Sequence, residues 1–319
     1  MDSTQKHPKT LLEAIRYFGQ PGVAVQYLAG LRWPDGAFCQ KCGLTGEDVY
    51  FMASQSRWKC RGCKAQWSVK VGTIMEDSAL PLDKWLSAIW MVANCKNGIS
   101  SYEIHRALGV TQKSAWFMLH RIRLAMKAGG LDLPFDGRGP FEADETFVGG
   151  KISNKHLGVR KALGGRVNSS AKAIVMGILE RGGRVRAKTI PNVTGPTLRG
   201  EVEKNVKPGS TLYTDALPSY RGLEKALFHE TVNHLETYVR GKVHTQGIEN
   251  FWSLLKRSLN GTYVNVEPAH LDSYVDEQAF RFNERDRNDG QRHAMVAANV
   301  GGKRLTYKAL IGKSGDVAW

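Results

Sequence analysis

Residues 141–150, FEADETFVGG, place three carboxylates in a segment that has the composition of a β-strand. Side chains alternate between the two faces of a strand, so Glu142 and Asp144 share one face and Glu145 points to the other. Residues 171–190 carry two further stretches, AKAIVMGILE and RVRAKTI, on either side of RGG, which predicts a β-hairpin. We therefore expect a sheet whose first strand carries acidic side chains.

The segments that follow the hairpin alternate between helical and extended patterns. TGPTLRGEVEKNV (194–206) has a helix-like composition, and STLYTD (210–215) predicts a strand that ends at Asp215. Two longer segments with helical periodicity come next, TQGIENFWSLLKRSL (245–259) and AHLDSYVDEQAFRFNER (269–285). The succession of strand, hairpin, helix, strand and helix is that of a ribonuclease H-like fold, so we expect a mixed sheet with helices in this half of the chain.

Three acids in this half, Asp144, Asp215 and Glu249, come from two predicted strands and one predicted helix. Such a set is what a pair of divalent cations needs for an in-line displacement at phosphorus. Without metal the same carboxylates would repel one another and raise one another's pKa. Each acid alone also fits an ordinary role as turn former, helix cap or exposed helix residue, so the interpretation depends on their order along the fold. Lys256 follows Glu249 by seven residues, nearly two helical turns, and shares its face.

The chain as a whole is strongly basic. Its 319 residues include 45 Lys and Arg against 30 Asp and Glu, a formal net charge of +15, and 42% of them are hydrophobic. This length fits two or three packed domains, and the excess positive charge favours a nucleic acid partner. An acidic membrane surface would also attract it, but the longest apolar run, residues 86–95, is too short to span a bilayer. The first ten residues contain no apolar signal-peptide core, so we expect a cytoplasmic protein, nucleoid-associated when bound to DNA.

Four of the five cysteines form two matching pairs, CQKC at 39–42 and CRGC at 60–63, with 17 residues between the inner cysteines. Two such turns can direct four thiolates toward one point, which is the ligand set of a tetrahedral zinc site. Four sulfur ligands leave no open position for water, so we expect a structural role. Four unrelated buried cysteines are the alternative, which the repeated spacing disfavours. The expected zinc ligands are Cys39, Cys42, Cys60 and Cys63.

Residues 82–127 change to helical periodicity in three pieces. Ser100 and Glu103 fit a capping box at the start of the second piece, and Gly109 lies in the turn before the third, which is the pattern of a helix-turn-helix. Between residues 104 and 131 there are five Lys or Arg and no acid. We therefore expect DNA binding, although a solvated basic face of a plain helical bundle has the same composition. The residues expected to contact DNA are Lys113, Arg121 and Arg123, and Gln112, Lys113 and Ser114 lie near the start of the recognition helix, where they could reach base edges.

Four stretches of the second half resemble the insertion-sequence transposases of the ISXO-like DDE family. They are DETFVGGK, LYTDALPSYRGL, VHTQGIENFWSLLKRSLNGTY and HLDSYVDEQAFRFNER. The cysteine pairs before them are similar to the N-terminal zinc ribbon of that family, and the resemblance extends from about Cys39 to Ile311. It implies a multidomain α/β protein, with a zinc ribbon and helix-turn-helix followed by a ribonuclease H-like mixed sheet with helices.

The resemblance also implies an enzyme, a DDE transposase that uses Mg2+ or Mn2+ to cut DNA at the element's ends and to join the freed 3′-hydroxyls to target DNA. Asp144 and Asp215 would be the first two catalytic metal ligands and Glu249 the third, with Lys256 and the neighbouring Arg257 contacting DNA near the reacting phosphate. The implied partners are terminal inverted repeats, target DNA and further copies of the chain, in a homodimer or larger synaptic complex.

The third ligand has two alternatives to Glu249, because the chain departs from the family pattern beside it. Where the family commonly has Asn, this chain has Gln246. Gln246 lies about one turn before Glu249 and shares its face more closely than Asn250 does. An amide oxygen can coordinate Mg2+ but lacks the charge of a carboxylate. Gln246 and Asn250 therefore remain alternatives to Glu249.

We expect four regions: N-terminal helices and zinc ribbon (1–75), a helix-turn-helix region (76–130), a catalytic domain (138–290) and a C-terminal tail (291–319). The segment 151–172, with six Lys or Arg and no acid, follows the first catalytic strand and would suit a DNA backbone. Two other functions fit parts of the pattern. One is a zinc-ribbon DNA-binding regulator with an inactive catalytic remnant, and the other is a ribonuclease H-like nuclease. The presence of all three acids in order favours the transposase over the regulator.

Overall fold

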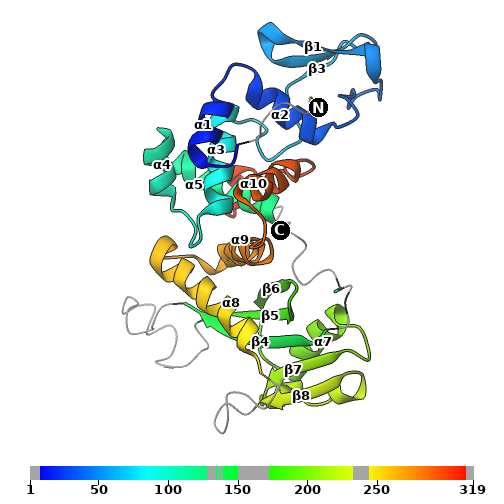
Figure 1. Cartoon of the computed structure of the whole chain (residues 1–319), viewed down its shortest axis with the longest axis vertical. Helices are drawn as coiled ribbons and strands as arrows, with labels where there is room; N and C mark the ends of the chain where they lie inside the picture. The colour runs from blue at the N-terminus through cyan, green and yellow to red at the C-terminus, as the bar shows by residue number, and fades with distance from the viewer. Residues whose placement is uncertain are drawn as a thin grey trace. The chain divides into compact units, whose positions relative to one another are not determined.

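The computed structural model of the chain describes residues 8–127, 134–135, 137, 139–149, 172–232 and 244–313. Contacts between residues divide the chain into two units, which we call the first unit (Met1–Met126 with Glu284–Trp319) and the second unit (Lys127–Asn283). Figure 1 labels most of the elements named below. Within the described part of the chain, no helix combines the length and the apolar character that crossing a membrane requires.

The first unit combines a small sheet with helices. The three strands of the sheet pair antiparallel in the order β1-β2-β3, and they carry or flank the second cysteine pair. The elements in chain order are α1 (Leu11–Phe18), α2 (Val23–Arg32), β1 (Val49–Met52), β2 (Arg57–Cys60), β3 (Gln66–Trp67), α3 (Leu82–Asn94), α4 (Ser101–Leu108), α5 (Gln112–Met126), α10 (Asp289–Ala298) and α11 (Tyr307–Leu310).

The predicted start and end of α4 are confirmed. The Ser100 side chain accepts a hydrogen bond from the backbone of Glu103, and the Glu103 carboxylate accepts one from the backbone of Ser100, which is a complete capping box. Gly109 ends the helix with φ +60°, a left-handed conformation that glycine adopts at little cost. α5 begins three residues later, so α4 and α5 form the helix-turn-helix pair that the spacing predicts.

Residues that follow Asn283 belong to the first unit. α10 packs on α3, and its His293 is buried, with Nδ1 3.1 Å from the Tyr27 hydroxyl and Nε2 3.2 Å from the Leu86 carbonyl oxygen. Burial lowers the pKa of His293 to about 4, so the ring is neutral at physiological pH. Within the described residues, the segment that we expected to be a C-terminal tail thus begins as a packed helix, because its buried side chains complete the core around α3.

The second unit contains a mixed sheet of five strands in the order β6-β5-β4-β7-β8. β4 is antiparallel to β5 and parallel to β7, β5 is antiparallel to β6, and β7 is parallel to β8. This arrangement confirms the predicted mixed α/β fold. The elements are β4 (Phe141–Val148), β5 (Ala173–Glu180), β6 (Val185–Ile190), α7 (Gly195–Asn205), β7 (Thr211–Asp215), the 3-10 helix η6 (Pro218–Tyr220), β8 (Phe228–Val232), α8 (Gln246–Arg257), the π-helix η8 (Ser258–Tyr263) and α9 (Leu271–Asn283).

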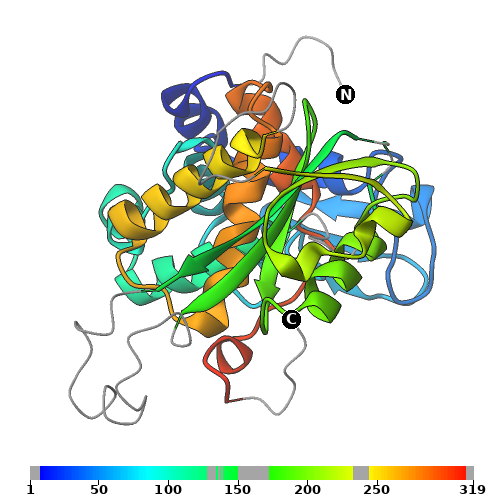
Figure 2. The same ribbon diagram turned by 90° about the horizontal axis from the view of Figure 1, so that it is seen from below.

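Helices cover the two faces of this sheet with separate hydrophobic clusters. On one face Phe141, Ala143 and Leu212 pack with residues of α7 and with Tyr220. On the other face Val175 and Leu179 pack with residues of α8 and α9. Figure 2 shows α8 and α9 on one side of the strands and α7 on the other. Odd-numbered positions of β4 therefore face α7, and even-numbered positions face α8, which decides where each acid of FEADETFVGG points.

Candidate active site and metal centre

The strand pairing brings Asp144 and Asp215 next to each other. β4 and β7 are parallel neighbours, with Phe141 opposite Leu212 and Glu142 opposite Tyr213. Continuing this register by two residues places Asp144 opposite Asp215. Both side chains are on the face that α8 covers, because residues two apart on a strand share a face. Two carboxylates that are distant in sequence thus lie side by side at one end of β7.

The three acids of β4 point as the alternation predicts. Glu142 accepts a hydrogen bond from the backbone N–H of Ile248 at 2.9 Å, and Asp144 accepts one from Nε1 of Trp252 at 2.9 Å, so both face α8. Glu145 points to the opposite face and accepts a hydrogen bond from the Tyr220 hydroxyl at 2.7 Å. Asp144 is therefore the acid of this strand that lies beside Asp215.

Electrostatic repulsion links the expected ligands. Burial and the nearby Asp215 carboxylate, with a smaller contribution from Glu249, raise the pKa of Asp144 to about 6, although hydrogen bonds from Trp252 and the Glu145 backbone act in the opposite direction. Burial, together with the charges of Asp144 and Asp215, raises the pKa of Glu145 to about 7 against the lowering effect of its Tyr220 hydrogen bond. A cation bound between these carboxylates would neutralise their mutual repulsion.

Glu249 lies in the first turn of α8, where its side chain is exposed and accepts a hydrogen bond from the Thr245 hydroxyl at 3.1 Å. Its charge acts on Asp144, so the helix brings it to the same part of the molecule as the two aspartates. Gln246 and Asn250, the alternatives for the third ligand, are exposed on the same helix. Lys256 and Arg257 are exposed in its last turn, where positive charge also interacts favourably with the helix dipole.

Two glycines explain how α8 comes so close to the acidic strands, and sequence patterns alone did not single them out. Gly177 pairs with Asp144 on β5, and a Cβ atom there would lie 2.7 Å from the Trp252 ring. A Cβ atom on Gly247 would lie 2.4 Å from Leu179 and 2.9 Å from the Glu142 carboxylate. Contacts below 3.0 Å require a shift, so a side chain at either position would displace the side chains that it meets or move α8 away from the sheet. A glycine inside a strand pattern was the available signal.

Glu142 has a different role from its neighbour on the same face. It is 1% exposed and forms an ion pair with Nε of Arg181 at 2.6 Å while accepting the Ile248 N–H. Arg181 also donates to the backbone carbonyl of His244 at 2.6 Å, just before α8. A carboxylate at a helix N-terminus is stabilised by the free N–H groups there. Glu142 and Arg181 therefore fix the start of α8, and with it the position of Glu249.

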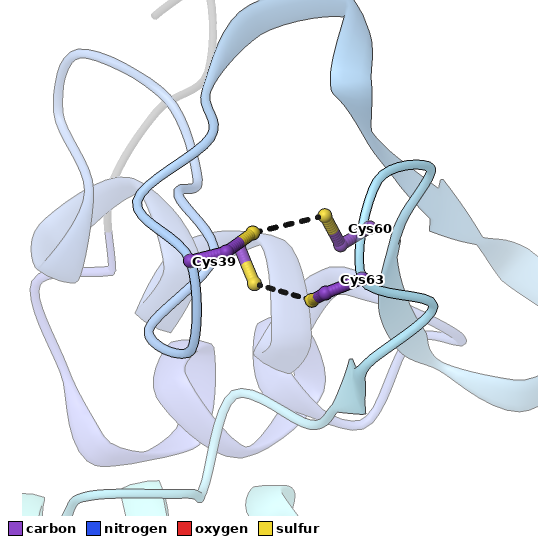
Figure 3. Close-up of side chains that lie close together, drawn as sticks. Cys39, Cys60 and Cys63 are labelled. Carbon is purple, nitrogen blue, oxygen red and sulfur yellow. Dashed lines mark hydrogen bonds between the residues drawn. The ribbon is translucent and has the colours of Figure 1, made fainter.

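The four paired cysteines of the first unit converge. Their sulfurs all lie within 4.8 Å of one another, with Cys39 Sγ 3.5 Å from Cys63 Sγ and Cys42 Sγ 3.6 Å from Cys60 Sγ. A tetrahedral zinc ion with Zn–S bonds of about 2.3 Å separates its sulfurs by about 3.8 Å. Figure 3 shows the sulfur of Cys63 directed toward that of Cys39, with the sulfur of Cys60 beside it on the same side of the site. The donor set and its spacing therefore fit zinc.

The two cysteine turns have the same backbone geometry. In each, the N–H of the first cysteine donates to the carbonyl five residues later, Cys39 to Leu44 at 2.8 Å and Cys60 to Ala65 at 3.0 Å. The residue after the second cysteine is left-handed in both, Gly43 with φ +78° and Lys64 with φ +60°. In the ranges that the structure describes, these cysteines are the only group of three or more His, Cys, Asp or Glu side chains whose donor atoms lie so close together.

The helix-turn-helix residues that we expected to contact DNA divide into two groups. Lys113 is exposed, with its ammonium 4.6 Å from the centre of the Tyr307 ring. Arg121 is 6% exposed and donates to the carbonyls of Leu305 and Glu76, both at 2.9 Å, while Arg123 is 1% exposed. A guanidinium that is buried and donates to backbone carbonyls is not accessible to a DNA phosphate. The sequence pattern identified the basic residues of α5, but it did not show which face of this helix packs against the rest of the first unit.

Two further predictions concern Gln112 and the basic segment. The Gln112 amide donates to the Ser101 hydroxyl at 2.8 Å, so it links α5 to α4. Residues 151–171 of the basic segment lie outside the described residues.

Two family models match the chain. The ISXO2-like transposase domain matches residues 137–283, which contain all three acids, and the transposase zinc-ribbon domain matches residues 22–66, which contain the four paired cysteines. An uncharacterized protein in transposable element ISH50 of Halobacterium salinarum is 26% identical over 278 residues, which cover 82% of this chain and 90% of that protein. An uncharacterized transposase-like protein of Haemophilus influenzae is 34% identical over 101 residues, 31% of this chain and 81% of that protein.

Proposed function

Because the chain belongs to the ISXO2-like transposase family, we propose that it binds the ends of an insertion sequence and catalyses metal-dependent DNA cleavage and strand transfer. The observation that carries this proposal is the placement of Asp144 beside Asp215 on the face that α8 covers, with Glu249 close enough to raise the pKa of Asp144. These acids form a cluster of like charge in a basic protein, as a site for cations and a polyanionic substrate requires.

The residues fit a catalytic divalent cation such as Mg2+ or Mn2+. Asp144, Asp215 and Glu249 supply oxygen ligands, which these hard cations prefer. Bound cations would stabilise the attacking and leaving oxygens of an in-line displacement at phosphorus. Two cations about 3.5–4 Å apart can each bind different carboxylates. The oxygens of Asp144, Asp215 and Glu249 therefore do not all have to reach a single metal position. The cysteine site would hold zinc in a structural role, because four sulfurs leave no open position.

The protein's own residues would prepare this site in three ways. Trp252 donates a hydrogen bond to Oδ2 of Asp144 and so holds this carboxylate in place for a ligand. Glu142 and Arg181 hold the start of α8, which carries Glu249 close enough to Asp144 for its charge to act there. Lys256, with Arg257 beside it, would neutralise charge on the DNA backbone close to the reaction.

Recognition of DNA would belong to the first unit. The zinc ribbon and the helix-turn-helix would bind the terminal inverted repeats, with Lys113 contributing a phosphate contact. Arg121 and Arg123 have no part in this proposal, because their side chains are buried. Synapsis of two ends calls for a homodimer or larger complex, which would also hold the target DNA.

The test is to replace single carboxylates. Asp144→Asn or Asp215→Asn should abolish cleavage of a DNA fragment that carries an element end, while binding of that fragment stays nearly unchanged. If both variants retain Mg2+-dependent cleavage, the assignment is wrong. If the parent protein binds ends but never cuts them, a regulator with an inactive remnant is the better description. A cut end that never joins a plasmid would favour a nuclease.

A further inference from the structure

The hydrogen-bonded pairing of β4 with β7 ends before it reaches the two aspartates. The paired positions, among the described residues of both strands, are Phe141 with Leu212 and Glu142 with Tyr213, whereas Asp144 and Asp215 lie two residues further along. On its other side, β7 remains paired with β8 as far as Asp215. The distance between the two aspartates therefore depends on contacts other than the β4–β7 ladder.

Tyr220 provides such a contact from the opposite face of the sheet. It ends η6, the short turn of helix that follows Asp215, and its side chain is 0% exposed within the cluster that also contains Phe141 and Leu212. Its hydroxyl donates to Oε2 of Glu145 at 2.7 Å. Because Glu145 is the residue after Asp144, this hydrogen bond joins the end of β7 to β4 at the level of the two aspartates.

The turn that carries Tyr220 is itself fixed at two points. The N–H of Leu217 donates to Oδ1 of Asp215 at 3.1 Å, and the Ser219 hydroxyl donates to the carbonyl of Val193 at 2.7 Å. The Asp215 carboxylate, the turn, the buried ring of Tyr220 and Glu145 thus form one continuous chain of contacts. A displacement of Tyr220 would be transmitted to the carboxylate of Asp215.

We propose that Tyr220 and Glu145 are positioning residues. From the face of the sheet opposite α8 they set the distance between Asp144 and Asp215, and so determine the affinity of the catalytic site for its divalent cation. This inference rests on the proposed function, in which both aspartates are metal ligands. Glu145 faces away from α8, so it acts through its neighbours and not as a ligand itself. Residues that hydrogen-bond behind metal ligands commonly change affinity or activity by about 10–100-fold when removed.

The chemistry of the hydrogen bond gives a specific pattern of variants. Tyr220→Phe removes only the hydroxyl and keeps the buried ring. Glu145→Gln keeps an oxygen that can accept from Tyr220, whereas Glu145→Ala removes it. We expect Tyr220→Phe and Glu145→Ala to raise the Mg2+ concentration for half-maximal cleavage by about tenfold, and Glu145→Gln to stay close to the parent protein.

The matched control is Tyr263→Phe, which removes a hydroxyl that donates to the buried carboxylate of Glu277 in the same unit. It should lower the melting temperature to a similar degree as Tyr220→Phe, but leave the Mg2+ requirement unchanged. Apparent Mg2+ affinity is also measured without activity, from the rise of the melting temperature with Mg2+ concentration on the full-length protein with its zinc bound.

An unchanged Mg2+ requirement in Tyr220→Phe would overturn the inference. If Tyr220→Phe does not fold, the comparison of Glu145→Gln with Glu145→Ala decides. An equal loss of Mg2+ affinity in both variants would also overturn the inference, because position 145 would then need a metal ligand and not a hydrogen-bond acceptor. Either result leaves the proposed function standing as long as Asp144→Asn abolishes cleavage. Retained cleavage in Asp144→Asn would refute the proposed function separately.

Discussion

Replacing Asp144 with Asn should make the metal-free protein more stable while it abolishes cleavage. Burial and repulsion from Asp215 raise the pKa of Asp144 from its ordinary value near 3.8 to about 6. One pKa unit corresponds to about 1.4 kcal/mol, so keeping this carboxyl ionised at pH 7.5 costs the metal-free fold roughly 3 kcal/mol. The amide of Asn carries no charge, and its oxygen can still accept the hydrogen bond of Trp252.

The assay is thermal unfolding at pH 7.5, with either EDTA or excess Mg2+. In a chain of this length, the gain should raise the melting temperature of the metal-free second unit by an amount on the order of 5–10 °C. Because EDTA also removes zinc, the unfolding of the second unit is followed separately, by hydrogen exchange of β4 and β5 amides. Added Mg2+ should stabilise the parent protein but not the variant, since one ligand is missing.

The matched control is Asp272→Asn in the same unit. Asp272 accepts hydrogen bonds from the N–H of Thr189 at 2.7 Å and from the Thr189 hydroxyl at 2.8 Å. These two donors stabilise the Asp272 carboxylate in the folded state. This variant should therefore be less stable than the parent protein. A metal-free Asp144→Asn protein that melts at or below the parent temperature would refute the reasoning, because the carboxylate would then not be held at an energetic cost.

Three other predictions follow from the same geometry. The metal-free second unit should lose stability as pH rises from about 4 to 7, because Asp144 and Glu145 have raised pKa values of about 6 and about 7 and bind more protons in the folded state than in the unfolded chain. The lowered pKa of His229 acts in the opposite direction, but it is one group against two. A titration of the melting temperature of this unit against pH checks the prediction, and a higher melting temperature at pH 7 than at pH 4 would contradict it. Zinc chelation should unfold the cysteine turns and abolish binding of element ends, as circular dichroism and a gel-shift assay would report; binding that survives chelation would exclude the ribbon from recognition. Lys113→Ala should weaken DNA binding and reduce by about 1 the slope of log binding constant against log salt concentration. Arg121→Ala should instead lower the free energy of unfolding by roughly 1–3 kcal/mol, because two carbonyls lose their buried donor. If only Arg121→Ala changed the slope, Arg121 and not Lys113 would be the phosphate contact.

Local patterns were sufficient for several features. Alternation along FEADETFVGG separated Glu145 from Glu142 and Asp144, because a strand has only two faces. The capping box of α4 was recognisable because its two hydrogen bonds join residues three apart. The repeated cysteine spacing predicted one site, because each turn is formed within a few residues.

Other features depend on contacts between distant segments and had no local signal. Arg121 and Arg123 looked like DNA contacts because charge is visible in a sequence, whereas the carbonyls of Glu76 and Leu305 that bury Arg121 come from far along the chain. The ion pair of Glu142 with Arg181 joins residues 39 apart. The link from Tyr220 to Glu145 joins residues 75 apart.

The sequence by itself determined which chemistry the chain contains: carboxylates on two strands and a helix, four thiolates in two turns, and an excess of positive charge. Only the tertiary structure decided which of these groups act on one another. Parallel pairing of β4 with β7 put Asp144 beside Asp215, and close packing of α8 over Gly177 brought Glu249 toward them. The physical reason is that composition and periodicity are properties of neighbouring residues, while burial and Coulomb repulsion are set by distances in space, which the chain reaches only when its sheet is assembled.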